Sequence, residues 1–235
     1  MAKTVVVTGC TKGIGLAIAT TFAGMGFNVA GCARNEADVK HLEAHLLQSG
    51  PGVKHRIVVC DVSKTNDLDN FVNTVISTYG KIDVLVNNAG VFLPGQLITE
   101  EEGTLEHLLQ TNVISAYKIT RSFLPGMIEA KSGSVFNICS IASLQAYDGG
   151  GSYSISKFAL LGFSKQLRHE MKPHNIRVTA VMPGATLTNS WAGVDMPEQR
   201  FIKADDIAKA IKAIYELNDY TDVEEIVIRP VMGDI

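Results

Sequence analysis

Tyr153 and Lys157 stand four residues apart in the stretch YSISK, which follows three consecutive glycines at 149–151. Residues at positions i and i+4 of a helix lie on the same face, so one helical turn would bring the phenol and the ammonium into one small volume. A free phenol has a pKa of about 10, and a nearby cation favours the phenolate and lowers that value. The pair therefore suits proton transfer, although an exposed pair with a snorkelling lysine would have the same spacing.

Three glycines follow the first apolar run of the chain. Gly9, Gly13 and Gly15 lie in TGCTKGIG (8–15), between TVVVT and the helical pattern LAIATTFAGMG. Glycines at such a place let the backbone turn tightly and approach a ligand, and the free N–H groups at a helix start attract a pyrophosphate. The spacing G-x-x-x-G-x-G departs from the G-x-G-x-x-G dinucleotide fingerprint, so the generic motif gives only partial support for a nucleotide site.

Polar residues also follow the later apolar runs. NNAG (87–90) comes after the fourth run, Ser140 after the fifth and PGATLT (183–188) after the sixth. In an open parallel sheet, ligands bind where the loops at the carboxyl ends of the strands meet. Asn112 lies inside the helical pattern TLEHLLQTNVISAYKITRSF, where an interior asparagine needs hydrogen-bond partners. We therefore expect these segments to gather at one edge of a sheet.

The elements that must position them alternate along the whole chain. Strand candidates are residues 4–8, 28–33, 54–60, 82–87, 133–139, 176–182 and 224–230. Such apolar runs, separated by helix-like stretches, are typical of a parallel sheet covered on both faces. We predict an α/β fold, namely a single-domain, Rossmann-type, doubly wound parallel sheet of seven strands with helices on both faces, over residues 1–235. Only the segment 185–201 lacks a period, and it is either a short flap on the substrate side or an ordinary connecting loop.

Composition excludes several classes of function. A net charge of -3 gives no basic field for nucleic acid or anionic lipid, and no apolar run approaches the roughly 20 residues of a membrane span. The first residues lack the apolar core of a signal peptide, so we expect a cytoplasmic protein. The four cysteines have no metal-ligand spacing, which indicates reduced, mostly buried thiols. HLEAH (41–45) lacks a glutamate directly after its first histidine, so we predict no metal site.

Together these segments resemble the short-chain dehydrogenase/reductase family. TGCTKGIG, Asp61, NNAG, Asn112, Ser140, YSISK and PGATLT occur in the family's order, and the match extends from Thr4 to Pro230. The resemblance implies hydride transfer between a nicotinamide C4 and a carbonyl or alcohol carbon, with Tyr153 as general acid/base. It further implies that Lys157 holds the nicotinamide ribose, that Ser140 hydrogen-bonds the substrate oxygen, and that Asn112 holds a water linking Lys157 to solvent.

The same resemblance implies a cofactor-binding set. Its members are Gly9, Thr11, Lys12, Gly13, Ile14, Gly15, Arg34, Asp61, Val62, Asn88, Ala89, Gly90, Tyr153, Lys157, Pro183, Gly184, Thr186 and Thr188. The glycine turn would hold the pyrophosphate and Asp61 would meet the adenine, unless Asp61 only starts a helix. Ala33 stands where NAD-binding sheets usually carry an acid, and Arg34 and Lys12 suit a 2′-phosphate, so we predict NADP(H). Each of these two cations is alternatively a solvated surface charge.

The substrate is the least defined part of the prediction. Candidate lining residues are Val91, Phe92, Leu93, Leu144, Gln145, Tyr147, Trp191 and Met196. They favour a small carbonyl or alcohol substrate, because they are mostly apolar. Two alternatives stay open: a 3-oxoacyl-[acyl-carrier-protein] reductase, and a non-enzymatic protein that senses NADP(H) without turnover. We expect a homodimer or homotetramer formed by the helices that carry Asn112 and Tyr153.

Overall fold

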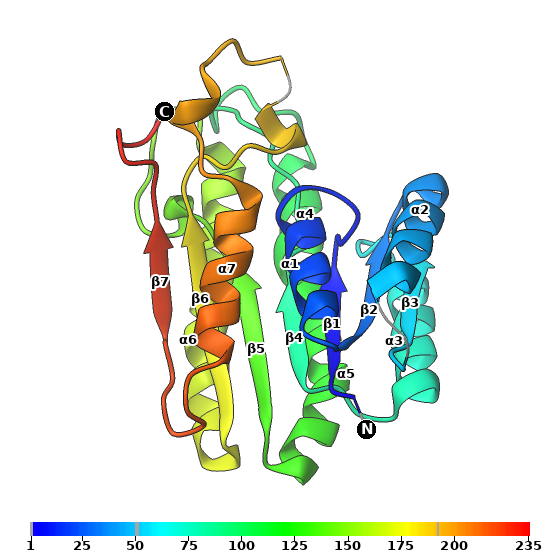
Figure 1. Cartoon of the computed structure of the whole chain (residues 1–235). Helices are drawn as coiled ribbons and strands as arrows, with labels where there is room; N and C mark the ends of the chain where they lie inside the picture. Colours follow the sequence, from blue (N-terminus) through cyan, green and yellow to red (C-terminus); the bar gives the residue numbers. More distant parts are fainter. Residues whose placement is uncertain (1, 50–51, 192) are drawn as a thin grey trace.

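Seven parallel strands form the single sheet of the computed structural model (Figure 1), which describes residues 2–49, 52–191 and 193–235. The strands are β1 (Thr4–Thr8), β2 (Asn28–Ala33), β3 (His55–Val59), β4 (Val84–Asn87), β5 (Gly133–Ile138), β6 (Ile176–Pro183) and β7 (Glu225–Ile228). Their order across the sheet is β3-β2-β1-β4-β5-β6-β7. The chain thus builds outward from β1 in one direction and then from β4 in the other, so the crevice between β1 and β4 is the topological switch point.

Alternation of side chains explains why the strands are apolar throughout. In β1, Val5 and Val7 belong to the core on one face of the sheet, and Val6 belongs to the core on the other face. All three are fully buried. Val6 pairs in register with Ala30 of β2 and Leu85 of β4, which face the same second core. A strand covered on both sides has no polar face to present to water, hence its continuous valines.

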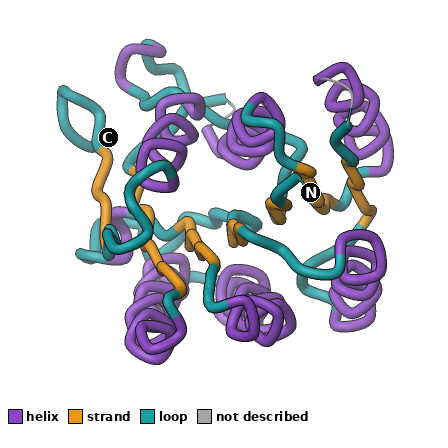
Figure 2. The backbone as a smooth tube through the Cα atoms, turned by 60° about the horizontal axis from the view of Figure 1, so that its bottom comes forward, coloured by secondary structure: helices purple, strands orange, loops and turns teal. Residues whose placement is uncertain are grey.

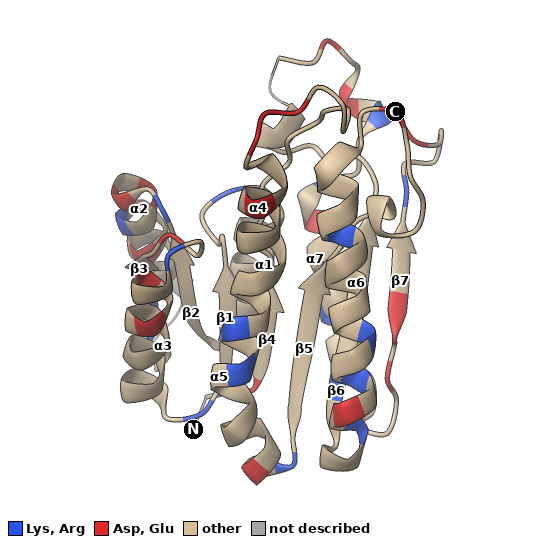
Figure 3. Ribbon diagram, turned by 180° about the vertical axis from the view of Figure 1, so that it is seen from behind, with Lys and Arg blue, Asp and Glu red and all other residues tan. Residues whose placement is uncertain are grey.

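Helices form a layer on each face of the sheet (Figure 2). They are α1 (Gly13–Gly24), α2 (Glu36–Leu46), α3 (Thr65–Tyr79), α4 (Thr104–Leu109), α5 (Ser115–Ala130), α6 (Gly151–Met171) and α7 (Ala204–Tyr215). Short 3₁₀ turns occupy Leu47–Ser49, Ile141–Ser143, Lys172–His174, Asn189–Trp191 and Glu198–Arg200. The helices α1, α2 and α7 pack on one face, and α3, α5 and α6 on the other. Charged residues lie mainly on the outer surfaces of the helices and in loops (Figure 3).

The predicted fold class is confirmed, and each predicted strand is present with ends that differ by at most two residues. One predicted helix is different in kind. The pattern over 104–123 is not a continuous α-helix, because a π-helical stretch, Gln110–Ile114, lies between α4 and α5. A π-helical turn inserts one extra residue and frequently marks a functional site. It contains Asn112.

Three further findings concern the described residues. No helix among them is both long and apolar enough to cross a membrane. Cys10, Cys32, Cys60 and Cys139 are all free and buried, as predicted. No group of three or more potential metal ligands occurs in the described part of the chain.

Candidate active site

The glycine-rich turn leaves β1 and starts α1 at the switch point. Gly9 and Gly13 have φ angles of +64° and +52°, a conformation that side chains with a Cβ rarely adopt. A Cβ on Gly15 would overlap the carbonyl oxygen of Gly9. Backbone conformation or steric overlap therefore explains why each of these three positions is a glycine, and together the glycines form one compact turn. No side chain caps the start of α1 at Lys12, so its first N–H groups remain available to an anion.

Asn88 fastens this turn to the end of β4. Its Nδ2 donates to the carbonyl oxygens of Thr8 at 2.9 Å and Gly9 at 3.0 Å. The Thr8 Oγ1 accepts from the backbone N–H groups of Asn88 and Ala89 at 3.0 and 2.9 Å. These bonds lie within the protein and need no ligand. The glycine-rich turn is thus held in shape by the NNAG segment.

Asn112 is buried in the π-helical stretch, with 1% of its surface exposed. Its Oδ1 accepts from the N–H of Val91 at 2.8 Å, and its Nδ2 donates to Val91 O at 3.1 Å and to Ser156 Oγ at 3.0 Å. Both side-chain hydrogens therefore have protein acceptors. Asn112 joins the loop after β4 to α6, and a water held by this residue would have to use an oxygen.

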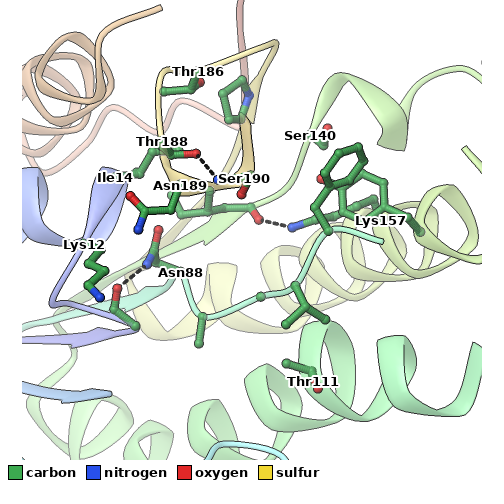
Figure 4. A pocket seen from close by; sticks show the side chains of 18 of the residues that line it. Lys12, Ile14, Asn88, Thr111, Ser140, Lys157, Thr186, Thr188, Asn189 and Ser190 are labelled. Atoms are coloured by element: carbon green, nitrogen blue, oxygen red, sulfur yellow. Dashed lines mark hydrogen bonds between the residues drawn. The ribbon is translucent and has the colours of Figure 1, made fainter. Parts of the chain in front are cut away.

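Ser140, Tyr153 and Lys157 meet at the end of β5. Ser140 follows β5, and its Oγ accepts from the N–H of Ala142 at 3.1 Å. Tyr153 lies in the first turn of α6, and the Lys157 Nζ is 5.8 Å from its ring centroid. Lys157 is buried and donates to the carbonyl oxygen of Ile138 at 2.9 Å (Figure 4). The predicted i, i+4 pair is thus present and points into the site instead of lying on the surface.

Burial dominates the ionisation of both groups. It raises the pKa of Tyr153 above the ordinary 10.0, while a hydrogen bond with Ser140 acts in the opposite direction. Burial also lowers the pKa of Lys157, which nearby Cys139 partly opposes. We expected a lowered pKa for Tyr153, and this expectation is wrong. The phenol faces the cavity but is closely surrounded by protein atoms, so the cost of desolvating a phenolate exceeds the attraction of Lys157.

A second corner of the site lies where β2 ends. Lys12 Nζ forms an ion pair with Asp38 Oδ2 at 2.7 Å, and both residues line the cavity together with Arg34. Asn35 caps α2 by accepting from the N–H of Asp38 at 2.9 Å, which brings Asp38 into the first turn. Lys12 and Arg34 were predicted from the sequence, and the carboxylate of Asp38 was not.

Asp61 follows β3 and also lines the cavity. Its Oδ1 accepts from Ser63 N at 3.0 Å and from Ser63 Oγ at 2.7 Å. Burial raises its pKa, but these hydrogen bonds, with the charges of Lys64 and Arg34, outweigh that effect, so the pKa lies below the ordinary 3.8. Asp61 therefore accepts within a local turn at the edge of the cavity, and it does not cap α3, whose N-cap residue is Lys64.

The segment after β6 covers the opposite side. A Cβ on Gly13 would lie 2.9 Å from Thr188 Cγ2, so Thr188 reaches across to the glycine turn. Trp191 packs against Phe92 and Phe201, with ring centroids 6.1 and 5.3 Å apart. Position 192 of the segment 185–201 lies outside the described residues.

One cavity of about 570 Å³ joins these regions, a volume within the range of ligand pockets. Of the predicted site residues, it is lined by Gly9, Thr11, Lys12, Ile14, Arg34, Asp61, Val62, Asn88, Ala89, Gly90, Ser140, Tyr153, Lys157, Pro183, Gly184, Thr186 and Thr188. Gly13, Gly15 and Asn112 are not in its lining. Of the predicted substrate residues, Val91, Phe92, Gln145, Tyr147 and Trp191 line the cavity, and Leu93, Leu144 and Met196 are not in its lining.

Several lining residues were not predicted. They include Cys32, Asn35, Asp38, Thr111, Ile138, Cys139, Ile141, Ala142, Asn189, Ser190, Asp234 and Ile235. Thr111 is notable because its buried Oγ1 has no hydrogen-bond partner among the described residues. Its position directly before Asn112 was the available clue. The glycine turn and the uncapped helix start together fit a phosphorylated ligand such as a dinucleotide.

Comparisons with known proteins agree with this geometry. Residues 3–199 match the family model described as short chain dehydrogenase. The chain is 31% identical to the sepiapterin reductase of Chlorobaculum tepidum over 243 aligned positions, which cover 100% of this chain and 99% of that protein. It is 36% identical to the 3-oxoacyl-[acyl-carrier-protein] reductase FabG of Chlamydia muridarum over 192 positions, or 82% and 77% of the two chains. Among solved structures, an alcohol dehydrogenase from Thermococcus sibiricus complexed with 5-hydroxy-NADP superposes with a TM-score of 0.92 at 27% identity, covering 100% of this chain and 99% of that one.

Proposed function

The chain belongs to the short-chain dehydrogenase/reductase family, and from this we propose that it is an NADPH-dependent oxidoreductase acting on a carbonyl or alcohol carbon. The observation that carries the proposal is the meeting of Ser140, Tyr153 and Lys157 in the cavity that contains the glycine turn. A sensor without turnover would need the cofactor site and would have no need of this trio.

Bound NADPH supplies the hydride, and the protein supplies orientation and one proton. As the carbonyl carbon is reduced, negative charge develops on its oxygen, so hydrogen-bond donors must meet that oxygen. Ser140 Oγ–H donates to it, and Tyr153 Oη–H donates to it and then transfers its proton. A raised pKa keeps Tyr153 protonated at neutral pH, which is the state a general acid needs.

Lys157 has two assigned roles in this proposal. Its Nζ, anchored on Ile138 O, keeps further N–H donors for the ribose hydroxyls of the cofactor. Its positive charge also stabilises the phenolate that remains after proton transfer. The absence of a side chain on Gly90 keeps this space open, since a Cβ there would lie 3.1 Å from Asn112 Oδ1 and 3.8 Å from Lys157 Nζ.

The preference for NADPH rests on Arg34 and Lys12, with the T. sibiricus enzyme and its NADP derivative as support. Both cations line the end of the cavity near β2, where the 2′-phosphate would lie. Ala33, at the end of β2, provides no carboxylate for a ribose 2′-hydroxyl. The neighbouring Asp38 opposes this preference, and its effect is measurable.

The substrate side is apolar and aromatic, with Phe92, Tyr147 and Trp191 in the wall. This lining, together with the full-length similarity to a sepiapterin reductase, favours a planar ketone as substrate. A 3-oxoacyl thioester is the second candidate, because of the similarity to FabG. The segment 185–201 contributes Trp191, and we assign it as a flap on this side.

We further assign the face formed by α5 and α6 to a homodimer or homotetramer contact. Tyr117 on α5 and Ile155 and Phe158 on α6 are 44%, 40% and 45% exposed. Exposed aromatic and aliphatic side chains gathered on one face are typical of subunit contacts. Light scattering that finds only a 25.3 kDa species would contradict this assignment.

The deciding experiment is a screen of NADPH oxidation against sepiapterin, a 3-oxoacyl thioester and a range of aldehydes and ketones. The Tyr153→Phe variant, which loses one hydroxyl and keeps the ring, is the matched control. We expect its kcat to fall by about 10²- to 10⁴-fold and its Kd for NADPH to stay within about twofold, because a positioned general acid contributes a factor of that size. If the variant keeps more than about half of the activity, Tyr153 is not the acid. NADPH binding without turnover of any compound would favour the sensor.

A further inference from the structure

The loop between β4 and α4, residues 91–103, is attached to the start of α6. Gly95 N–H donates to Gly149 O at 2.9 Å, just before the helix. Farther along the loop, Glu100 Oε1 accepts from the N–H of Ser152 at 2.8 Å, and Glu100 Oε2 accepts from the Ser152 hydroxyl. Figure 3 shows this acidic part of the loop in red, directly before α4. One carboxylate therefore binds the backbone and side chain of a residue 52 positions away.

Glu100 caps the N-terminus of α6, which has no cap from its own N-cap residue. The residue before the helix, Gly150, has no side chain, so the helix has no local side-chain cap. The first N–H groups of a helix need acceptors, and a carboxylate there also offsets the positive end of the helix dipole. Gly151 is shaped for this contact, because its φ is +39° and a Cβ on it would overlap Glu100 Oε1. The glycine run at 149–151 thus admits an acceptor from elsewhere in the chain.

The same loop touches Tyr153 directly. Phe92, near its start, packs edge-on against the Tyr153 ring, with centroids 4.8 Å apart and planes at 78°. Tyr153 follows Ser152 in the first turn of α6, so the loop holds the tyrosine at two points, the ring through Phe92 and the backbone through Glu100. A change in the direction of this first turn would move the phenol oxygen relative to Ser140 and to the substrate.

We infer that Glu100 is a positioning residue of the active site, which fixes the first turn of α6 and through it the phenol of Tyr153. The inference rests on the proposed function of Tyr153. A displacement of about 1 Å at a reacting group is enough to lower a rate by about a hundredfold, so a lost cap at this turn affects catalysis more than an ordinary cap does.

The test compares Glu100→Ala and Glu100→Gln with Glu102→Ala. Glu102 is exposed on the same loop, and in the described part of the chain its carboxylate has no hydrogen-bond or ion-pair partner. Glutamine can accept from Ser152 N–H and donate to Ser152 Oγ, so it restores both contacts without the charge. With a ketone turned over by the wild type, we expect Glu100→Ala to lower kcat by about tenfold or more. KM and the Kd for NADPH should stay within about twofold, and Glu100→Gln should recover kcat to within about threefold of the wild type.

Hydrogen exchange provides a readout that needs no turnover. In Glu100→Ala, the amides of residues 151–157 should exchange faster than in the wild type, and in Glu102→Ala they should not. Unchanged exchange in Glu100→Ala overturns the inference, even if the enzyme proves inactive on every compound. A loss of thermal stability with kcat equal to that of the Glu102→Ala control also overturns it, because the contact is then only structural. A raised KM with retained kcat makes Glu100 a substrate contact instead.

Discussion

Replacing Asp38 by asparagine should tighten the binding of NADPH and leave that of NADH unchanged. In the protein without ligand, Asp38 is bonded to Lys12 at 2.7 Å, and both side chains line the cavity near Arg34. A 2′-phosphate that binds in this corner must break the ion pair between Lys12 and Asp38, and it is then repelled by the negative charge of Asp38. Asparagine is nearly the same size, so the substitution removes the charge and little else.

Two contributions determine how much Asp38→Asn changes the binding free energy of NADPH. The side chains of Lys12 and Asp38 are 56% and 30% exposed, and an ion pair at such a site contributes about 0.2 to 1 kcal/mol. Two unit charges about 7 Å apart in water interact by about 0.6 kcal/mol, and a phosphate carries up to two charges. Together these give about 0.8 to 2.2 kcal/mol, so Asp38→Asn should lower the Kd of NADPH by about fourfold to fortyfold.

The assay is a titration of cofactor fluorescence with NADPH and with NADH, at low and at high salt. Glu36→Gln is the matched control, because Glu36 lies in the same first turn of α2, pairs with Lys40 and is outside the cavity lining. Arg34→Ala should have the opposite effect and weaken NADPH by about tenfold or more, since a hydrogen bond to a charged group contributes about 1.5 to 3 kcal/mol. Equal tightening of NADH and NADPH in Asp38→Asn, or the same change in Glu36→Gln, would refute the reasoning.

Three further predictions follow from the site. Trp191→Ala should change KM and substrate preference more than the Kd of NADPH, because Trp191 packs on Phe92 at the substrate side; equal effects on every substrate with a lower melting temperature would identify Trp191 as core instead. For ketone reduction, kcat/KM should fall only as the pH rises through the pKa of Tyr153, which burial places above 10.0. Alcohol oxidation needs the phenolate, and the cationic oxidised nicotinamide favours it, so kcat/KM for oxidation should rise at a lower pH than that. Measured pH profiles for the two directions that change at the same pH would contradict this. Burial raises the pKa of Cys10 to about 12 and that of Cys139 to about 11, so a thiol reagent at pH 8 should label the native chain far more slowly than the unfolded chain, and rapid labelling of a native cysteine would show that it is reachable.

Local sequence patterns predicted the strands well because each pattern was compatible with only one arrangement of the strand in the sheet. The valines of β1 are buried on both faces, so no alternating pattern was possible, and only a doubly covered parallel sheet fits them. Gly9, Gly13 and Gly15 were equally informative, since each has a steric reason within a short stretch of chain. The position of Ser140 and Tyr153 at one edge of the sheet then followed from the parallel direction of the strands.

Contacts between distant segments were outside the reach of such patterns. Glu100 caps a helix that begins about fifty residues later, and the next two residues are also glutamates, so nothing local distinguished it. Asp38 has the composition of an ordinary helix start, and its ion pair with Lys12 depends on the turn that brings α1 and α2 together. The direction of the Tyr153 pKa shift was predicted wrongly for the same reason, because a sequence lists neighbouring charges but not the depth of burial.

The anchor of Lys157 on the main-chain carbonyl of Ile138 has a consequence for how this protein can change over generations. A carbonyl oxygen is present whichever amino acid is encoded at position 138, so no substitution there deletes the partner of the lysine. On this side of the contact, mutation can disturb it only by moving β5, which pairs with β4 on one side and with β6 on the other in the interior of the sheet. The buried charge of Lys157 is therefore held by the backbone of the fold itself, and drift in the surrounding side chains can alter the choice of substrate while this lysine stays in place.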